Sequence, residues 1–259
     1  MALTNQYLDK CAAILETVRA QSETIRTAAA WCAHSILNER IVHMFASGHS
    51  RIMVEEMWPR YGSFPGFNPI VELSLTFHNL VVGANGQRQA MFLENVSGLA
   101  ERILRNYVLS EQDTAIVISS SGTNIVPVEM AELFQKNKIK VIAIITHHHS
   151  LASESKRKDG KKLSDFAELI LDTGAPVGDA MIQIEGMESP VSPGSTVGGI
   201  AIINSIKAEL AHILTQHGKP PKALVAGNIA GKEKASAIFE AAYDEHALNM
   251  SRLYNFPKK

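Results

Sequence analysis

Three consecutive serines followed by glycine, threonine and asparagine make the segment of the chain best suited to bind an anion. This serine turn reads Ser119-Ser120-Ser121-Gly122-Thr123-Asn124. It follows an apolar run at 115–118 and precedes a helical pattern at 126–135, so its backbone N–H groups lie at the positive end of a helix. Serine hydroxyls can donate to phosphate oxygens, and Gly122 permits close approach of the backbone. Capping the helix needs only one Ser or Thr, so we predict that the turn binds a phosphate.

A second small polar turn, Gly48-His49-Ser50, follows an apolar run at 41–45. Glycine and serine are common where a strand leads into a helix, so the turn alone is a weak signal. The pattern leaves open whether His49 contacts a ligand or is simply an exposed turn residue.

A strongly apolar helical pattern begins at Ser195 and Thr196, after a segment rich in Gly and Pro. Ser or Thr at such a position either caps the helix or contacts a ligand that lies in front of it. We include both residues as candidates, together with Asn204, Lys207 and Glu209 further along the helix.

Three adjacent histidines, His147-His148-His149, follow the apolar run at 141–145. Neighbouring histidines cannot easily bind one ion together, and no carboxylate stands at ligand spacing. We therefore predict a polar loop here and no metal site. His78 is interpreted as a structural residue.

The elements that must position these residues alternate between short apolar runs and helical patterns. The predicted strands lie at 41–45, 70–73, 115–118, 141–145 and 169–171. Helical patterns between them, at 93–107 and 126–135, are long enough for crossover connections. This alternation predicts a three-layer, doubly wound α/β fold with a five-stranded parallel sheet of flavodoxin-like order 2-1-3-4-5. Ligands bind beside strands 1 and 3 of such a sheet, where both polar turns are expected.

Helical segments flank the predicted sheet. Within the N-terminal helical segment, 1–38, residues 4–38 carry apolar or small residues at a three-four spacing, interrupted at Ser22, which indicates one long helix or two shorter ones. A last helix is expected at about 233–254. We treat 1–259 as a single domain with its sheet core at 40–217 and a C-terminal helix within 218–259. The apolar stripe from Leu8 to Ile36 and the apolar helix 200–214 predict a homo-oligomer, a dimer or a tetramer.

Composition restricts the partners. Lys plus Arg (25) nearly balances Asp plus Glu (26), and the basic cluster at 156–162 is interpreted as a solvated loop, so we expect no nucleic acid partner. The N-terminus lacks a basic and apolar leader pattern, and we expect no membrane association. Cys11 and Cys32 lie in apolar helical patterns and are expected to be reduced. A cytoplasmic location is predicted.

The strand–Gly-x-Ser turn, the strand–Ser-x-Ser-Gly turn and the five strand–helix units resemble the sugar isomerase (SIS) domain family over residues 40–217. Phosphoheptose isomerase and the isomerase half of glucosamine-6-phosphate synthase belong to that family. The resemblance implies that the serine turn holds the phosphate of a sugar phosphate. It also implies that Gly48, His49, Ser50, Ser195 and Thr196 lie around the sugar. Asn124 departs from the family pattern, which usually has Ser or Thr at that position.

The segment Glu55-Glu56-Met57-Trp58-Pro59-Arg60-Tyr61 resembles a Glu-Glu-Leu-x-x-Arg-Tyr segment of phosphoheptose isomerase that carries the proposed base. The resemblance implies a phosphosugar isomerase without metal or organic cofactor, in which Glu55 or Glu56 moves a proton through an enediol and His49 assists. Two adjacent residues of a helix cannot both face inward, so at most one is the base, and the pattern leaves open that both are solvated surface carboxylates. The alternatives are a phosphosugar sensor that acts through a protein partner, or a phosphosugar etherase or deaminase.

Overall fold

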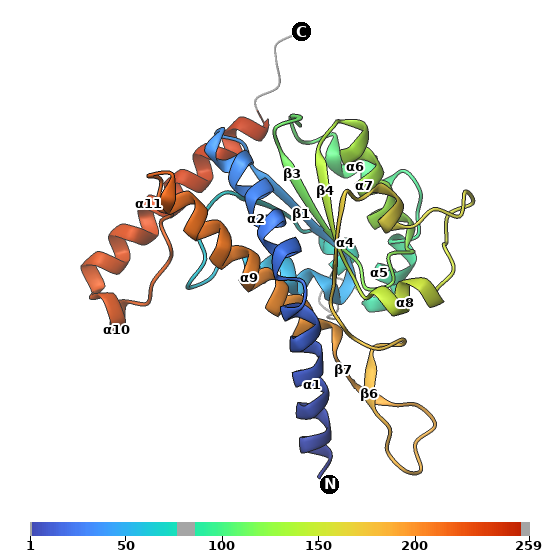
Figure 1. Ribbon diagram of the computed structural model, residues 1–259. Coiled ribbons are helices and arrows are strands. Elements are labelled where there is room, and N and C mark those ends of the chain that lie inside the picture. Colours follow the sequence, from blue (N-terminus) through green and yellow to red (C-terminus); the bar gives the residue numbers. More distant parts are fainter. Residues whose placement is uncertain (1, 77–85, 255–259) are drawn as a thin grey trace.

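A five-stranded parallel sheet forms the centre of the molecule, and the computed structural model describes residues 2–76 and 86–254. Its strands lie in the order β2-β1-β3-β4-β5, which confirms the predicted topology (Figure 1). They are β1 (Val42–Ala46), β2 (Phe67–Ile70), β3 (Thr114–Ile118), β4 (Lys140–Ile145) and β5 (Leu169–Asp172). Every residue of β1 and β3 is buried, because helices cover both faces of the sheet.

Alternate residues of each strand pack into two separate hydrophobic layers. Met44 and Ile116 face one layer, whereas Phe45 and Val117 face the other. The first layer is covered by α2 (Ser22–Leu37), α3 (Ile52–Met57) and α9 (Ser195–Gln216), and the second by α6 (Leu99–Leu104), α7 (Ile125–Lys136) and the 3₁₀ helix η3 (Leu163–Phe166). The period-two alternation of the strands thus sorts side chains between the two layers.

The N-terminal helical pattern forms two helices, α1 (Leu3–Arg19) and α2, which separate close to the predicted interruption at Ser22. Helix α1 packs against a two-stranded antiparallel ribbon, β6 (Ala180–Ile182) and β7 (Val191–Pro193), and both extend away from the sheet (Figure 1). At the other end of the chain, α10 (Gly227–Ala230) precedes α11 (Lys232–Tyr254), close to the predicted last helix.

Helix α9 is the most apolar long helix of the described residues. By length and composition alone it could span a membrane. Its residues Ile202, Ile206 and Leu210 are fully buried in the layer that α2 and the sheet share. The helix therefore has the position of a core helix.

Several local predictions were wrong. The second strand ends at Ile70, and Leu73 begins helix α4 (Leu73–Thr76). The strand contains Pro69, which an edge strand tolerates. The helix predicted at 93–107 is two helices, α5 (Gln87–Leu93) and α6, since Gly98 turns the chain at a φ of 86°. The ribbon β6–β7 was not predicted, and His78 lies outside the described residues.

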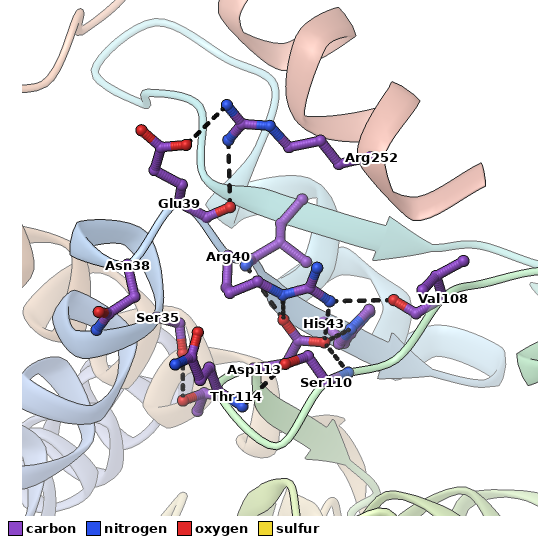
Figure 2. Close-up of polar contacts among 12 residues, drawn as sticks. Ser35, Asn38, Glu39, Arg40, His43, Val108, Ser110, Asp113, Thr114 and Arg252 are labelled. Carbon is purple, nitrogen blue, oxygen red and sulfur yellow. Dashed lines mark hydrogen bonds and ion pairs between the residues drawn. The ribbon is translucent and has the colours of Figure 1, made fainter. Parts of the chain in front are cut away.

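A buried charged cluster closes the amino end of the sheet (Figure 2). The Asp113 carboxylate accepts two hydrogen bonds from Arg40, at 2.8 and 2.9 Å, and a third from the backbone N–H of Ser110 at 2.8 Å. His43, the second residue of β1, lies with Nε2 at 3.2 Å from Asp113 and Nδ1 at 3.0 Å from the amide of Asn68. The cluster ties β1 to the start of β3 and lies at the end of the sheet opposite to the predicted site.

Candidate functional site

A cavity of about 270 Å³ opens at the carboxyl ends of β1 and β3. The residues that line it come from both predicted turns, from the segment around α5, from α8 (His147–Ala152) and from the start of α9. They are Ser47, Gly48, His49, Ser50, Met53, Gln87, Ala90, Met91, Glu94, Ser119, Ser120, Ser121, Asn124, His149, Asp179, Ser195 and Thr196. The two turns that the topology was expected to bring together therefore meet in one cavity.

The serine turn is folded so that part of its backbone is left without partners. Gly122 has a φ of 64°, and its N–H donates back to the Ser119 carbonyl and hydroxyl at 3.1 and 3.2 Å. Among the described residues, no acceptor takes the backbone N–H groups of Ser120, Ser121 or Asn124. These three residues line the cavity, so the turn offers unused donors where an anion is expected.

Gly122 and Thr123 do not line this cavity, in contrast to the role that the resemblance implies for them. The positive φ of Gly122 favours glycine, and a Cβ atom there would also stand 3.3 Å from the Ser150 hydroxyl, so the glycine serves the backbone of the turn. The buried Thr123 hydroxyl bonds to that of Ser121 at 2.9 Å. Both residues shape the turn, and a ligand contact from either stays a prediction.

Glu94 is a buried carboxylate of the cavity that the sequence did not reveal. The residue is 9% exposed, and the Ser47 hydroxyl donates to Oε2 at 2.7 Å. Its carbonyl accepts the N–H of Val126 in the first turn of α7 at 2.9 Å, which fixes Glu94 to the helix that follows the serine turn. Burial raises the pKa of Glu94, and this outweighs the opposite effects of the Ser47 hydrogen bond and of the charge of Lys156.

His149 and Asp179 line another part of the cavity. The prediction of a polar loop at 147–149 was wrong, since these residues begin α8 and His149 is half-buried. The backbone N–H of Gly178 donates to Nδ1 of His149 at 3.1 Å, so a neutral His149 carries its proton on Nε2. Asp179 accepts the N–H of Ser195 at 2.6 Å and its hydroxyl at 2.7 Å. The Ser195 hydroxyl is thus held by Asp179 at the edge of the cavity.

Two glycines bring the start of α9 close to the end of β5 and to helix α3. A Cβ atom at Gly198 would stand 1.8 Å from the carbonyl oxygen of Thr173, and one at Gly199 would stand 2.3 Å from the sulfur of Met53. Only glycine fits at either position without a shift of its neighbours. This close approach places Ser195 and Thr196 at the cavity.

Glu55 and Glu56 are not among the residues that line the cavity. They line a separate groove of about 460 Å³ with Tyr61, Phe239 and other residues of α3 and α11. Glu55 forms an ion pair with Arg51 at 3.5 Å and is half exposed to solvent. Within one chain, the structure does not bring the predicted bases to the serine turn.

Glu56 is held by its neighbours as a structural carboxylate. It accepts a hydrogen bond from the Asn204 amide at 2.9 Å and pairs with Arg60. Burial raises the pKa of Glu56, but the hydrogen bonds from Asn204 and Arg60 outweigh it and the pKa is lowered. Lys207 donates to the Glu56 carbonyl at 2.7 Å, and Glu209 lines a groove beside α1 and α2. The candidates on α9 beyond Thr196 therefore lie outside the cavity.

The cavity presents hydroxyls, backbone N–H groups, histidines and two carboxylates. Within residues 2–76 and 86–254, no three His, Cys, Asp or Glu side chains are grouped as metal ligands. A set of neutral donors beside one buried carboxylate suits a phosphorylated polyhydroxy compound.

Comparisons with known proteins agree with this architecture. The SIS domain family matches residues 6–146. A UPF0309 protein of Listeria monocytogenes serotype 4b is 30% identical over 245 residues, which cover 94% of this chain and 96% of the relative. A UPF0309 protein of Halalkalibacterium halodurans is 31% identical over 235 residues, with 89% and 95% covered.

Two solved structures share the fold at 13% identity and a TM-score of 0.50. One is a phosphoheptose isomerase from Francisella tularensis, with 82% of this chain and 100% of that chain covered. The other is the Vibrio vulnificus NanR protein complexed with ManNAc-6P, with 94% and 69% covered. At this identity the likeness concerns the fold alone.

Proposed function

Because the chain belongs to the SIS domain family, we propose that its cavity binds a sugar phosphate, with the phosphate on the serine turn. The observation that carries the proposal is the set of unused backbone N–H groups of Ser120, Ser121 and Asn124 within the described structure. Backbone donors at the start of a helix stabilise an anion without a charged side chain. The sugar then extends from the serine turn toward Glu94 and His149.

We further propose that the protein interconverts an aldose phosphate and its ketose isomer, with Glu94 as the general base. Glu94 accepts the proton from carbon 2 of the open-chain aldose, and that electron pair forms the carbon 1–carbon 2 double bond of an enediol as the carbonyl oxygen gains a proton. Return of the carbon-bound proton to carbon 1, with loss of the hydroxyl proton from oxygen 2, gives the ketose. A carboxylate whose pKa is raised by burial suits this transfer near neutral pH.

In this proposal, two histidines interact with the oxygen atoms of the substrate. His49 lines the cavity at the end of β1, where it assists ring opening or the proton transfer between oxygens. His149 presents the Nε2 proton of its neutral form because Nδ1 is occupied by the Gly178 N–H. The serine turn and these donors together hold the substrate so that its carbon acid meets Glu94.

Replacement of Ser119 and Ser121 by Ala is expected to weaken sugar-phosphate binding and to leave the fold intact. Each lost hydrogen bond to a charged phosphate costs about 1.5–3 kcal/mol of binding free energy.

A thermal-shift screen of the wild type against hexose phosphates and their amino and N-acetyl derivatives identifies a ligand. A ligand at one hundred times its dissociation constant adds about 2.7 kcal/mol to the stability of the protein.

The matched control is Ser251→Ala, because Ser251 is an exposed serine on α11, far from the cavity lining. Titration calorimetry on both variants measures the affinity, and a melt without ligand checks the fold. A double variant that folds and binds with the affinity of the wild type excludes the hydroxyls of Ser119 and Ser121 as phosphate donors.

We also propose that the protein is a homo-oligomer, a dimer or a tetramer. Leu8 and Leu15, one heptad apart on α1, are 57% and 45% exposed, so this helix offers an apolar face that the rest of the described chain does not cover. Light scattering at micromolar concentration is expected to give at least twice the chain mass of 28.2 kDa. Leu8→Glu together with Leu15→Glu is expected to reduce that mass, and a wild type that scatters as a monomer contradicts the proposal.

A further inference from the structure

The basic loop, residues 153–162, is folded onto the serine turn. The backbone N–H of Lys156 donates to the Thr123 carbonyl at 3.2 Å, and that of Leu163 donates to the Gly122 carbonyl at 2.8 Å. The sequence was interpreted as a solvated loop. These two bonds instead fix the loop to the backbone of the serine turn.

Arg157 anchors the middle of the basic loop. It pairs with Glu132 of α7 at 2.7 Å and with Asp159 at 2.6 Å, and its side chain is only 15% exposed. The hydrogen bond to Asp159 and the pairing with Glu132 raise the pKa of Arg157 despite its burial. Because two carboxylates neutralise this guanidinium, Arg157 serves to hold the loop in place.

Lys156 extends its ammonium group to the edge of the cavity. Nζ donates to Oδ1 of Asn124 at 2.5 Å, and Asn124 is both a cavity residue and the N-cap of α7. An N-cap side chain normally accepts an N–H of the second or third helical residue. Here the second, Val126, donates to the Glu94 carbonyl, and the third, Pro127, has no N–H. The Asn124 oxygen is therefore free to hold Lys156.

We propose that Lys156, positioned by Asn124, is the cation that binds the phosphate of the ligand; this assignment rests on the proposed function. An ammonium group has three donors, so Lys156 keeps two for a phosphate after its bond to Asn124. The charge of Lys156 also lowers the pKa of Glu94, against the effect of burial, so this charge acts on a group inside the cavity. The pair gives the site a preference for dianionic phosphate monoesters over neutral sugars.

The assignment also accounts for the departure of Asn124 from the family pattern. A Ser or Thr at this position would offer its hydroxyl to the ligand directly. The side-chain oxygen of Asn124 accepts the hydrogen bond from Lys156, and its N–H₂ group stays available as a donor to the ligand. The amide of Asn124 and the ammonium group of Lys156 together thus take the place of the Ser or Thr hydroxyl of the family pattern.

Lys156→Ala is expected to weaken binding of inorganic phosphate, and of a hexose 6-phosphate found by the screen, by about tenfold, the effect of one charge-assisted hydrogen bond on a partly solvated anion. Lys158→Ala is the matched control, because Lys158 is an exposed lysine of the same loop and its removal changes the net charge equally. Its affinity is expected to stay within about twofold of the wild type, as for a screened charge. Calorimetry at low and high salt measures both variants, and the salt dependence should decrease only in Lys156→Ala.

Asn124→Ala in the wild type and in the Lys156→Ala background tests the positioning role. If Asn124 acts through Lys156, its replacement weakens binding less when Lys156 is already absent. Additive losses, or equal losses in Lys156→Ala and Lys158→Ala, overturn the assignment. If binding needs Ser119 and Ser121 but is indifferent to Lys156, the assignment fails and the proposed function stands. If the wild type binds no sugar phosphate, both fail.

Discussion

Glu94→Gln is expected to abolish the exchange of the carbon-bound proton of a bound hexose 6-phosphate with deuterated water. Gln keeps the size of the side chain and can still accept the Ser47 hydrogen bond, but it cannot take up a proton from carbon. Loss of a general base typically lowers the rate by a factor of about 100 to 10,000. The affinity for the sugar phosphate is expected to change little, since the phosphate contacts remain. Proton NMR of the substrate measures the exchange, and calorimetry measures the affinity.

The matched controls are Glu55→Gln and Glu56→Gln, the residues that the resemblance to phosphoheptose isomerase implicates. Both lie in the groove of α3 and α11, so a base acting within one chain predicts near-normal exchange in these variants. If exchange is lost in one of these variants and is normal in Glu94→Gln, the base is a glutamate of α3. That glutamate would then act in the cavity of a second copy of the chain. Wild-type protein that binds sugar phosphates and exchanges no proton with any of them is a sensor.

The pH dependence of the exchange gives a second measurement on the same carboxylate. Burial raises the pKa of Glu94, and the base acts only when it is ionised. The rate is therefore expected to fall as the pH decreases through this raised pKa, at a higher pH than for an ordinary carboxylate. Ser47→Ala removes a hydrogen bond that favours the ionised form, so the fall should move to still higher pH.

The sheet could be predicted because buried parallel strands leave a strong signal. Runs such as 141–145 are apolar at every position, since both faces of the strand are covered. The order of strands then followed from the connections, and it placed the serine turn beside the Gly48–Ser50 turn. The second strand was predicted at 70–73, whereas β2 lies at 67–70. Asn68 and Pro69 break the apolar run of the sequence, although the backbone is extended there.

The carboxylate of the cavity could not be predicted because its position depends on packing. Glu94 follows a short helix and stands in a sequence without any polar motif, so nothing local distinguishes it from a surface residue. Its place is set by the Ser47 hydroxyl and the Val126 N–H, which come from distant parts of the chain. His149 and Asp179 were missed for the same reason. The adjacent pair Glu55-Glu56, in contrast, was selected from its local sequence alone, which carries no information on whether these side chains reach the cavity.

Asp113→Ala is expected to cause a large loss of stability. Arg40 would lose its counter-charge and keep the Val108 carbonyl as an acceptor, and the buried His43 ring would lose the partner of its Nε2 (Figure 2). Removal of one partner from a buried ion pair typically costs about 3–5 kcal/mol, which is a large part of the stability of a domain. Urea unfolding followed by circular dichroism measures the loss. Glu111→Ala is the control, because its ion pair with Lys138 is long and exposed, and no measurable change is expected.

The acid side of the stability curve tests whether the charge of Asp113 is what matters. Burial raises the pKa of Asp113, but the hydrogen bonds from His43 and Arg40 outweigh it and hold the pKa below its usual value. A carboxylate with a lowered pKa adds stability above its unfolded pKa of about 3.9, and this is lost as the pH falls through the folded pKa. Asp113→Asn keeps the shape and lacks the charge, so its deficit relative to the wild type should be constant near neutral pH and shrink below about pH 4. A deficit that stays the same in acid would mean that the hydrogen-bond geometry of the cluster, and not its charge, stabilises the amino end of the sheet.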